Sequence, residues 1–190
     1  MTAIPSGAAC YFCLGEEADE EGKLPVRDCS CRGDSAGFAH FSCLTKYCEQ
    51  KCKAAGDGEV GVFTEPWKIC NNCKQYFQDR LSIDLASACY SFAESTYGHP
   101  DSNKWDKLKV LTALHLQIIA LSRTKLIGSD KKLIIKEMKI IIRKFLSMID
   151  QTKKEHSMSS WVHMPKGSGE FVYYTALCVK YEAFAHDQLG

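Results

Sequence analysis

Eight side chains that can bind a metal ion occur as four pairs near the start of this 190-residue chain. The pairs are Cys10 and Cys13, Cys29 and Cys31, His40 and Cys43, and Cys70 and Cys73. Thiolate and imidazole are ligands that Zn²⁺ prefers, and a structural zinc site takes four of them in a tetrahedral shell. Two pairs can fill one shell. The spacing therefore predicts two closed structural zinc sites, with no open position for a catalytic water.

Cysteine can also serve as a small buried hydrophobic residue, or form disulfides in a secreted protein. Four spaced pairs that include a histidine favour metal binding over burial. Residues 1–10 lack the basic start and apolar run of a signal peptide, so we expect an intracellular, reducing compartment, the cytoplasm or the nucleus. Cys48 and Cys52 lie outside the pairs, and we interpret them as spare thiols in preference to alternative ligands.

The order of the ligands, four Cys, one His and three Cys, resembles that of the RING-CH (RING-variant) zinc finger. The second pair is Cys-x-Cys and the third is His-x-x-Cys, and the segment from Cys31 to Leu44 is similar to that family's Cys-x-Gly-Ser-x-x-x-x-His-x-x-Cys-Leu. The family usually places seven residues between the fourth ligand and the His, and this chain has eight. We expect the extra residue in the turn between Gly33 and Gly37. The resemblance covers residues 1–80.

The resemblance implies a cross-brace, in which the first and third pairs share one ion and the second and fourth pairs share the other. Cys10, Cys13, His40 and Cys43 then form site one, and Cys29, Cys31, Cys70 and Cys73 form site two. Metal binding would supply folding free energy on the order of 10 kcal/mol per structural site. The expected fold of residues 1–80 is a small α+β zinc-stabilised, RING-like module.

The resemblance also implies a RING-type ubiquitin-protein ligase, whose partners are a ubiquitin-conjugating enzyme (E2) and a protein substrate. The family's E2-binding surface lies between the two zinc loops, and no residue there forms a covalent intermediate. The matching positions here are Phe12, Leu44, Tyr47, Trp67 and Lys74. Tyr47 stands where related sequences often have Trp. Packing around the zinc ions is the alternative role for all five residues.

Helical periodicity replaces the cysteine pairs beyond residue 80, which predicts an all-α helical bundle over residues 81–152. The first helix should end near Gly98. The second, over residues 103–123, is apolar almost all round and should be buried, with His115 as a core or boundary residue. The third, over residues 129–152, should have one apolar face and one basic face.

The basic face of the third expected helix carries Lys132, Lys136, Lys139, Arg143 and Lys144. Such a face is usually solvated, and the alternatives are a membrane surface or an acidic partner. No run of eighteen or more uncharged apolar residues occurs, so we expect no transmembrane span.

The end of the chain is expected to be a polar linker over residues 153–169 and a helix over residues 170–190. Tyr174, Leu177 and Tyr181 resemble the start of a tetratricopeptide repeat. Half a repeat cannot form an array, because repeats bury their faces against neighbours. Either this helix packs on the bundle, or the chain is a short relative of longer repeat proteins.

The charge of the chain is divided unevenly. Residues 1–80 carry nine Lys or Arg and twelve Asp or Glu, whereas residues 81–190 carry fifteen and eleven. Seven thiolates would outweigh the charge of two Zn²⁺ ions and make the first module more acidic still. An acidic module does not favour nucleic acid as a partner.

A non-catalytic binding module is the main alternative to a ligase. A PHD finger, which often reads histone tails, shares the ligand order, and Trp67 near the seventh ligand would suit it. Its usual spacing differs, because this chain has one residue inside the second pair and eight before His40. A further alternative is an adaptor whose zinc module has lost ligase activity.

Overall fold

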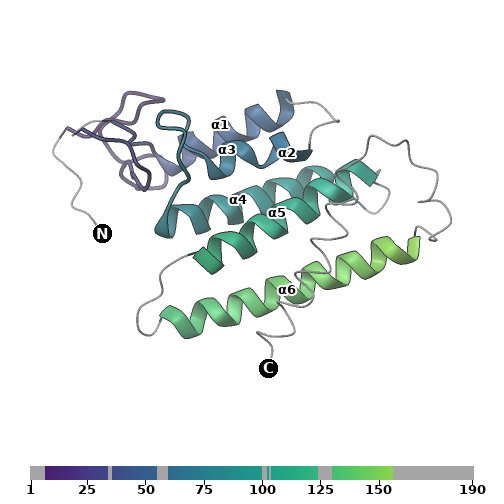
Figure 1. Ribbon diagram of the computed structural model, residues 1–190. Coiled ribbons are helices and arrows are strands. Elements are labelled where there is room, and N and C mark those ends of the chain that lie inside the picture. Colours follow the sequence, from purple (N-terminus) through teal and green to yellow (C-terminus); the bar gives the residue numbers. More distant parts are fainter. Residues whose placement is uncertain are drawn as a thin grey trace. The chain divides into compact units, whose positions relative to one another are not determined.

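The computed structural model describes residues 7–33, 36–54, 60–99, 102, 104–123 and 130–155 of the chain (Figure 1). Its helices are α1 (Phe41–Ala54), α2 (Val60–Phe63), α3 (Glu65–Lys68), α4 (Asp79–Tyr97), α5 (Lys104–Arg123) and α6 (Asp130–Glu155). The β structure in the described ranges is limited to two isolated antiparallel bridges, Val26 with Ala39 and Ile69 with Tyr76. The expected α+β module is therefore mainly helices and loops.

Helix α1 starts directly after His40 and contains the other ligand of the third pair, Cys43, in its first turn. Leu44, Cys48 and Cys52 follow one another at intervals of four residues and are all buried. This spacing places them on one face of the helix, which is the face that packs.

The long interval between the sixth and seventh ligands contains the two short helices α2 and α3. Residues 55–59 lie outside the described ranges, and α2 begins at Val60. Pro66 stands in the first turn of α3, where its missing N–H costs no hydrogen bond. Phe63 and Trp67 are both almost fully buried, so this interval contributes to the core.

Helices α4 and α5 lie side by side as an antiparallel hairpin, with α1, α2 and α3 against it (Figure 1). Their bounds agree with the predicted first and second helices. The buried residues of α5 occur all round its axis, as the sequence predicted, because the consecutive positions Val110, Leu111, Thr112 and Ala113 are all buried. His115 is half-buried, and burial lowers its pKa to about 4.

An aromatic cluster joins the zinc-ligand segment to the hairpin. The ring of Phe92 on α4 lies 6.3 Å from Phe63, 6.0 Å from Trp67 and 6.1 Å from Tyr97, measured between centroids. These separations are typical of packed aromatic rings. The contacts join α2 and α3 to α4, and Met1–Lys125 accordingly forms one compact unit.

The start of α4 is also connected to the metal-ligand segment through Asp28, the residue before Cys29. The carbonyl oxygen of Asp28 accepts a hydrogen bond from the N–H of Gln78 at 2.7 Å, and its carboxylate accepts one from the N–H of Leu81 at 3.4 Å. Gln78 is the N-cap residue of α4, and its own side chain makes no capping bond. Asp28 thus supplies acceptors that the first turn of α4 would otherwise lack.

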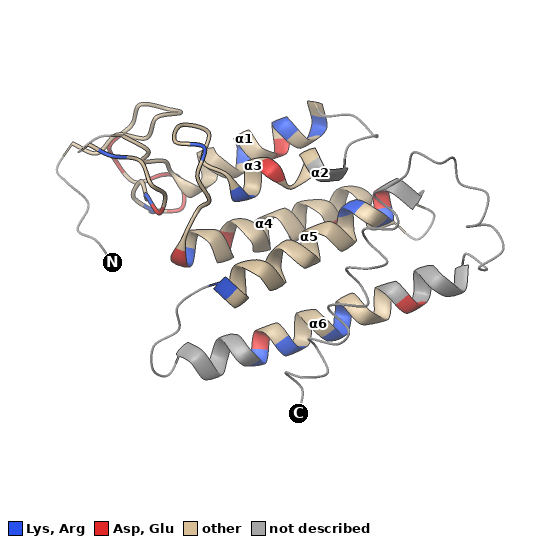
Figure 2. Ribbon diagram, in the orientation of Figure 1, with Lys and Arg blue, Asp and Glu red and all other residues tan. Residues whose placement is uncertain are grey.

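Leu126–Gly190 forms a second compact unit, of which the structure describes α6. Met138, Ile142 and Phe145 are buried on one face, while Lys136, Arg143 and Lys144 are exposed. Basic and acidic residues both occur along the described part of α6 (Figure 2). The predicted amphipathic pattern is present for these residues, and Lys132 lies outside the described side chains. Ile140 is also exposed, at 56%.

Helix α6 continues to Glu155, which is three residues into the predicted linker. The rest of the linker and the predicted C-terminal helix, with Tyr174, Leu177 and Tyr181, lie outside the described residues. Within the described ranges, no helix has the length and apolar character needed to traverse a bilayer.

Candidate metal centre

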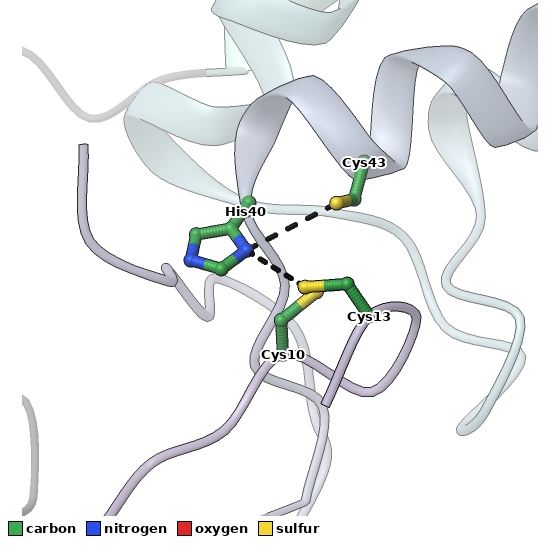
Figure 3. A group of neighbouring side chains, drawn as sticks. All are labelled: Cys10, Cys13, His40 and Cys43. Carbon is green, nitrogen blue, oxygen red and sulfur yellow. Dashed lines mark hydrogen bonds between the residues drawn. The ribbon is translucent and has the colours of Figure 1, made fainter. Parts of the chain in front are cut away.

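The first and third pairs of ligands lie together. One donor atom from each of Cys10, Cys13, His40 and Cys43 falls within 4.8 Å of all the others (Figure 3). The Nδ1 atom of His40 is 3.3 Å from Cys13 Sγ and 4.0 Å from Cys43 Sγ. Two ligands of a tetrahedral ion with Zn–S near 2.3 Å and Zn–N near 2.0 Å are about 3.5 Å apart. The group therefore has the donors and the size of a metal shell.

The second and fourth pairs form an equivalent group from Cys29, Cys31, Cys70 and Cys73, again with all sulfur atoms within 4.8 Å. Cys31 Sγ and Cys70 Sγ are 3.8 Å apart, close to the value of about 3.8 Å expected between two thiolates on one Zn²⁺. The pairs thus interleave along the chain. Two clusters of the predicted composition can each hold a metal ion.

The two Cys-x-x-Cys turns have the same backbone conformation and the same backbone hydrogen bond. Leu14 N–H donates to the Cys10 carbonyl at 2.7 Å, and Lys74 N–H donates to the Cys70 carbonyl at 2.9 Å. Both donors have left-handed backbone conformations, with φ of 62° and 57°. This region favours glycine, so the residue types at these two positions do not predict it. The shared conformation directs both sulfur atoms of each turn to one side.

A backbone carbonyl orients the imidazole of His40. Its Nε2 atom lies 2.6 Å from the carbonyl oxygen of Glu17. A carbonyl can only accept, so Nε2 must carry the proton and Nδ1, which faces the sulfur atoms, is left to donate its lone pair to a metal. Such a partner behind a ligating histidine fixes both its tautomer and its ring orientation. Sequence reasoning did not identify the role of Glu17, because it depends on the main chain alone.

Each cluster contains one thiol that ionises readily. Burial opposes ionisation of Cys10, but the N–H groups of Cys13, His40 and Phe12 outweigh it and lower the Cys10 pKa to about 7. In the other cluster, burial raises the pKa of Cys31 to about 11, whereas the pKa of Cys73 is lowered to about 7 by N–H and thiol donors in spite of its burial. Metal binding must therefore release protons, and affinity should fall on acidification.

Two polar side chains hold the loops beside site one and site two. Asp19 accepts hydrogen bonds from the Ser42 hydroxyl at 2.7 Å and from the N–H groups of Glu21 and Lys23. The Ser42 bond attaches this loop to the first turn of α1. The Arg27 guanidinium donates to the carbonyls of Gly33 and Ala36. These two bonds hold the turn between Gly33 and Gly37, where the residue additional to the family's usual spacing was expected.

Gly37 closes that turn against site two, with φ of +79°. A Cβ atom at this position would lie 2.6 Å from Cys31 Cβ and 2.7 Å from Cys31 Sγ. Residues 34 and 35 lie outside the described ranges, but Gly33 also has positive φ, at 96°. Glycine is thus needed at Gly37 for both backbone conformation and space.

Cys48 and Cys52 do not belong to either cluster. Their thiols donate to the carbonyls of Pro66 and Phe63, each at 3.1 Å, and Cys52 Sγ accepts from Trp67 Nε1 at 3.1 Å. Burial raises the pKa of Cys52 to about 11, which keeps it protonated and able to donate. These contacts attach α1 to α2 and α3. They support the interpretation of both residues as spare thiols.

Replacement of the indole tests this packing. Trp67→Phe removes the N–H donor to Cys52 and part of a fully buried ring, and should lower the free energy of unfolding by about 1–3 kcal/mol. Both metal ions should be retained. Urea unfolding at fixed free zinc measures the change, and Tyr76→Phe, at a residue 50% exposed, is the control. Loss of metal from Trp67→Phe would contradict a purely packing role.

The five residues matched to an E2 surface fall into two groups. Leu44 and Trp67 are 2% and 1% exposed, so the packing alternative describes them and their side chains offer no contact surface. Phe12 and Tyr47 are half-buried with ring centroids 5.1 Å apart, and Lys74 is exposed. The three residues with solvent-accessible side chains therefore lie on the first metal turn, on α1 and beside the last metal ligand.

A shallow groove of about 180 Å³ lies between α1 and the site-two turn. It is lined by Tyr47, Lys51, Val62, Glu65, Pro66, Ile69, Cys70, Asn71 and Lys74. Its apolar members come from α1, α2 and the segment around α3, and the two lysines stand at exposed positions. Sequence reasoning identified Tyr47 and Lys74 but missed the groove, because Val62, Pro66 and Ile69 carry no motif of their own.

No protein-family model, curated protein or solved structure matches this chain. The structure itself contains two Cys/His clusters that can hold metal ions in a largely helical chain.

Proposed function

We propose that the two clusters bind Zn²⁺ in a RING-type cross-brace and that the chain is a RING-CH-type ubiquitin-protein ligase. Cys10, Cys13, His40 and Cys43 would hold one ion, and Cys29, Cys31, Cys70 and Cys73 the other. Thiolate-rich closed shells favour zinc over harder cations. The interleaved order of the pairs and the similarity from Cys31 to Leu44 support the family assignment.

One observation carries the proposal of an E2 surface. Phe12 contacts Tyr47, and Tyr47 lines a groove that extends to Lys74 beside the last ligand. Protein-binding surfaces combine aromatic residues and an apolar centre with a polar rim. This groove has an aromatic pair beside it, apolar lining residues and a charged rim. The groove lies between α1 and the site-two turn, and the contact of Tyr47 with Phe12 connects it to the site-one turn. The RING-like resemblance leads us to expect the E2 on the surface between these two zinc loops.

The mechanism on this proposal is positional. The groove would hold a ubiquitin-charged E2 so that its thioester meets a substrate lysine in attack geometry. Zinc would supply rigidity to the two turns and take no part in the chemistry. Lys74 stands on the rim, and its Nζ lies 3.2 Å from Asn71 Oδ1. No side chain of this protein would form a bond to ubiquitin.

Metal content and ubiquitin discharge measured on one sample test the proposal. Zinc is first counted on purified full-length protein, and release of ubiquitin from a panel of charged E2 enzymes to free lysine is then followed. We expect two zinc ions per chain and faster discharge from at least one E2. Two ions with no accelerated discharge would reject the ligase and leave an adaptor, and fewer than two would reject the ligand assignment.

Phe12→Ala separates the contact surface from the metal sites. The ring is half-buried and its loss should reduce E2-dependent discharge about tenfold or more, since aromatic anchors dominate protein interfaces. Both zinc ions should remain, because the side chain between two ligands is not itself a donor. Leu24→Ala is the matched control, at an apolar residue that is 50% exposed and outside the groove. Full activity of Phe12→Ala would contradict the proposed surface.

A histone-tail reader of the PHD type is less well supported. That function was tied to Trp67, whose indole is 1% exposed and hydrogen-bonded to Cys52. A peptide could not reach it without opening α1 from α3.

Recruitment of the substrate is proposed to fall to the helical half, where α6 presents exposed Lys136, Arg143 and Lys144. These charges favour an acidic substrate surface.

A further inference from the structure

The eight ligands differ in their access to solvent. Cys13 is the exposed one of the eight, whereas Cys10, His40 and Cys70 are buried and the other four are intermediate. Leu14, the residue after Cys13, is 79% exposed. Cys13 is therefore the ligand residue most accessible to a small reagent in solution.

Site one also contains thiols placed to react with Cys13 after an initial oxidation. The donor atoms of Cys10, Cys13 and Cys43 all lie within 4.8 Å of one another. A disulfide needs its sulfur atoms at about 2 Å, and a Cys-x-x-Cys turn can reach this with small side-chain rotations. Site one has three thiols and site two has four, so one disulfide leaves site one with only a single thiolate and His40.

We propose that Cys13 is an oxidation site, at which a peroxide converts site one to a disulfide and releases its zinc ion. The Cys13 thiolate attacks one peroxide oxygen, the O–O bond breaks, and a sulfenic acid and hydroxide form. The thiolate of Cys10 or Cys43 then attacks the sulfenic sulfur, and a second hydroxide leaves as the disulfide forms. Two thiolates lose two electrons, and hydrogen peroxide is reduced to two hydroxide ions.

The reaction would remove the E2 surface while site two stays closed. Phe12 stands between Cys10 and Cys13, and its contact with Tyr47 depends on the conformation of that turn. The other two ligands of site one, His40 and Cys43, lie at the start of α1, which carries Tyr47. Oxidation at Cys13 therefore links redox state to the availability of the proposed surface. The inference needs zinc in site one, but it does not need ligase activity.

Zinc release and peptide mapping on the full-length protein test the proposal. Protein with two counted zinc ions is treated with limiting hydrogen peroxide, free zinc is followed with a chromophoric chelator, and disulfides are mapped by mass spectrometry at the point where one ion is free. We expect one ion to leave first, with a disulfide that joins Cys13 to Cys10 or Cys43. A first disulfide within site two, or simultaneous loss of both ions, would overturn the proposal.

A pair of matched variants strengthens the test. Cys13→His keeps a zinc donor but removes the exposed thiol, and should make the first release about tenfold slower at equal peroxide. Cys31→His makes the same change in site two and should leave that first release unchanged. Equal slowing by both variants would overturn the assignment to Cys13. If either variant binds fewer than two ions, the position of the first disulfide in the wild-type chain still tests the proposal.

Discussion

Removal of the metal ions with a chelator and a reductant should unfold the α4–α5 hairpin together with the zinc-ligand segment. Each structural zinc site contributes on the order of 10 kcal/mol at neutral pH, whereas a whole domain is stable by about 5–15 kcal/mol. The free energy lost with two metal sites therefore exceeds the stability that the hydrophobic core of Met1–Lys125 can provide. We expect a single cooperative loss of the helical signal from α1, α4 and α5.

The contacts between the hairpin and the ligand segment are the reason for this coupling. Phe92 of α4 packs against Phe63 and Trp67, which lie between the sixth and seventh ligands. Asp28, next to the ligand Cys29, accepts hydrogen bonds from the N-terminal end of α4. When the ligand segment loses its fold, α4 loses both its aromatic neighbours and the acceptors at its first turn.

Hydrogen exchange on the full-length protein can resolve this effect by segment. Peptides from α4 and α5 should exchange as rapidly as those from the metal turns once zinc is removed. Peptides from α6 provide an internal control, because α6 belongs to the second compact unit and should change less. Full protection of α4 and α5 in the metal-free protein would show that the hairpin is an independent domain, and the coupling would be rejected.

Local residue patterns were enough to predict the metal clusters and the helices. The ligand types and their pair spacing depend only on neighbouring residues, and the bounds of α4 and α5 follow from apolar periodicity and from Gly98. The pairing of the clusters came from the resemblance to a known family, since spacing alone allows other pairings. The two clusters group the eight ligands as that resemblance implied.

Contacts across the chain were not predictable in the same way. Leu44 and Trp67 were matched to an exposed surface, but their burial depends on how α3 packs on α1 and α4. The left-handed conformations of Leu14 and Lys74 carry no residue signal, because glycine is the usual residue there. The groove beside Tyr47 is assembled from three helices and a metal turn, so no local pattern could reveal it.

Gly37→Ala should empty site two while site one stays filled. The added methyl group would lie 2.6 Å from Cys31 Cβ, 2.7 Å from Cys31 Sγ and 3.3 Å from Cys29 Sγ. Two ligands must move to avoid it, and displaced ligands cannot keep a tetrahedral shell. We expect one zinc ion per chain, or a site-two affinity lower by about 100-fold or more. Chelator competition on the purified protein measures both.

Gly22→Ala separates the steric effect from backbone strain. Gly22 has φ of +74°, close to the +79° of Gly37, but a Cβ there would meet no atom within 4 Å. Both substitutions carry the left-handed penalty of about 1–2 kcal/mol, and only Gly37→Ala adds a clash with metal ligands. Two tightly bound ions in Gly22→Ala and one in Gly37→Ala would place the effect at the Cys31 contact. Equal loss in both would assign it to strain in the turns, and equal retention would contradict the close approach of Gly37 to site two.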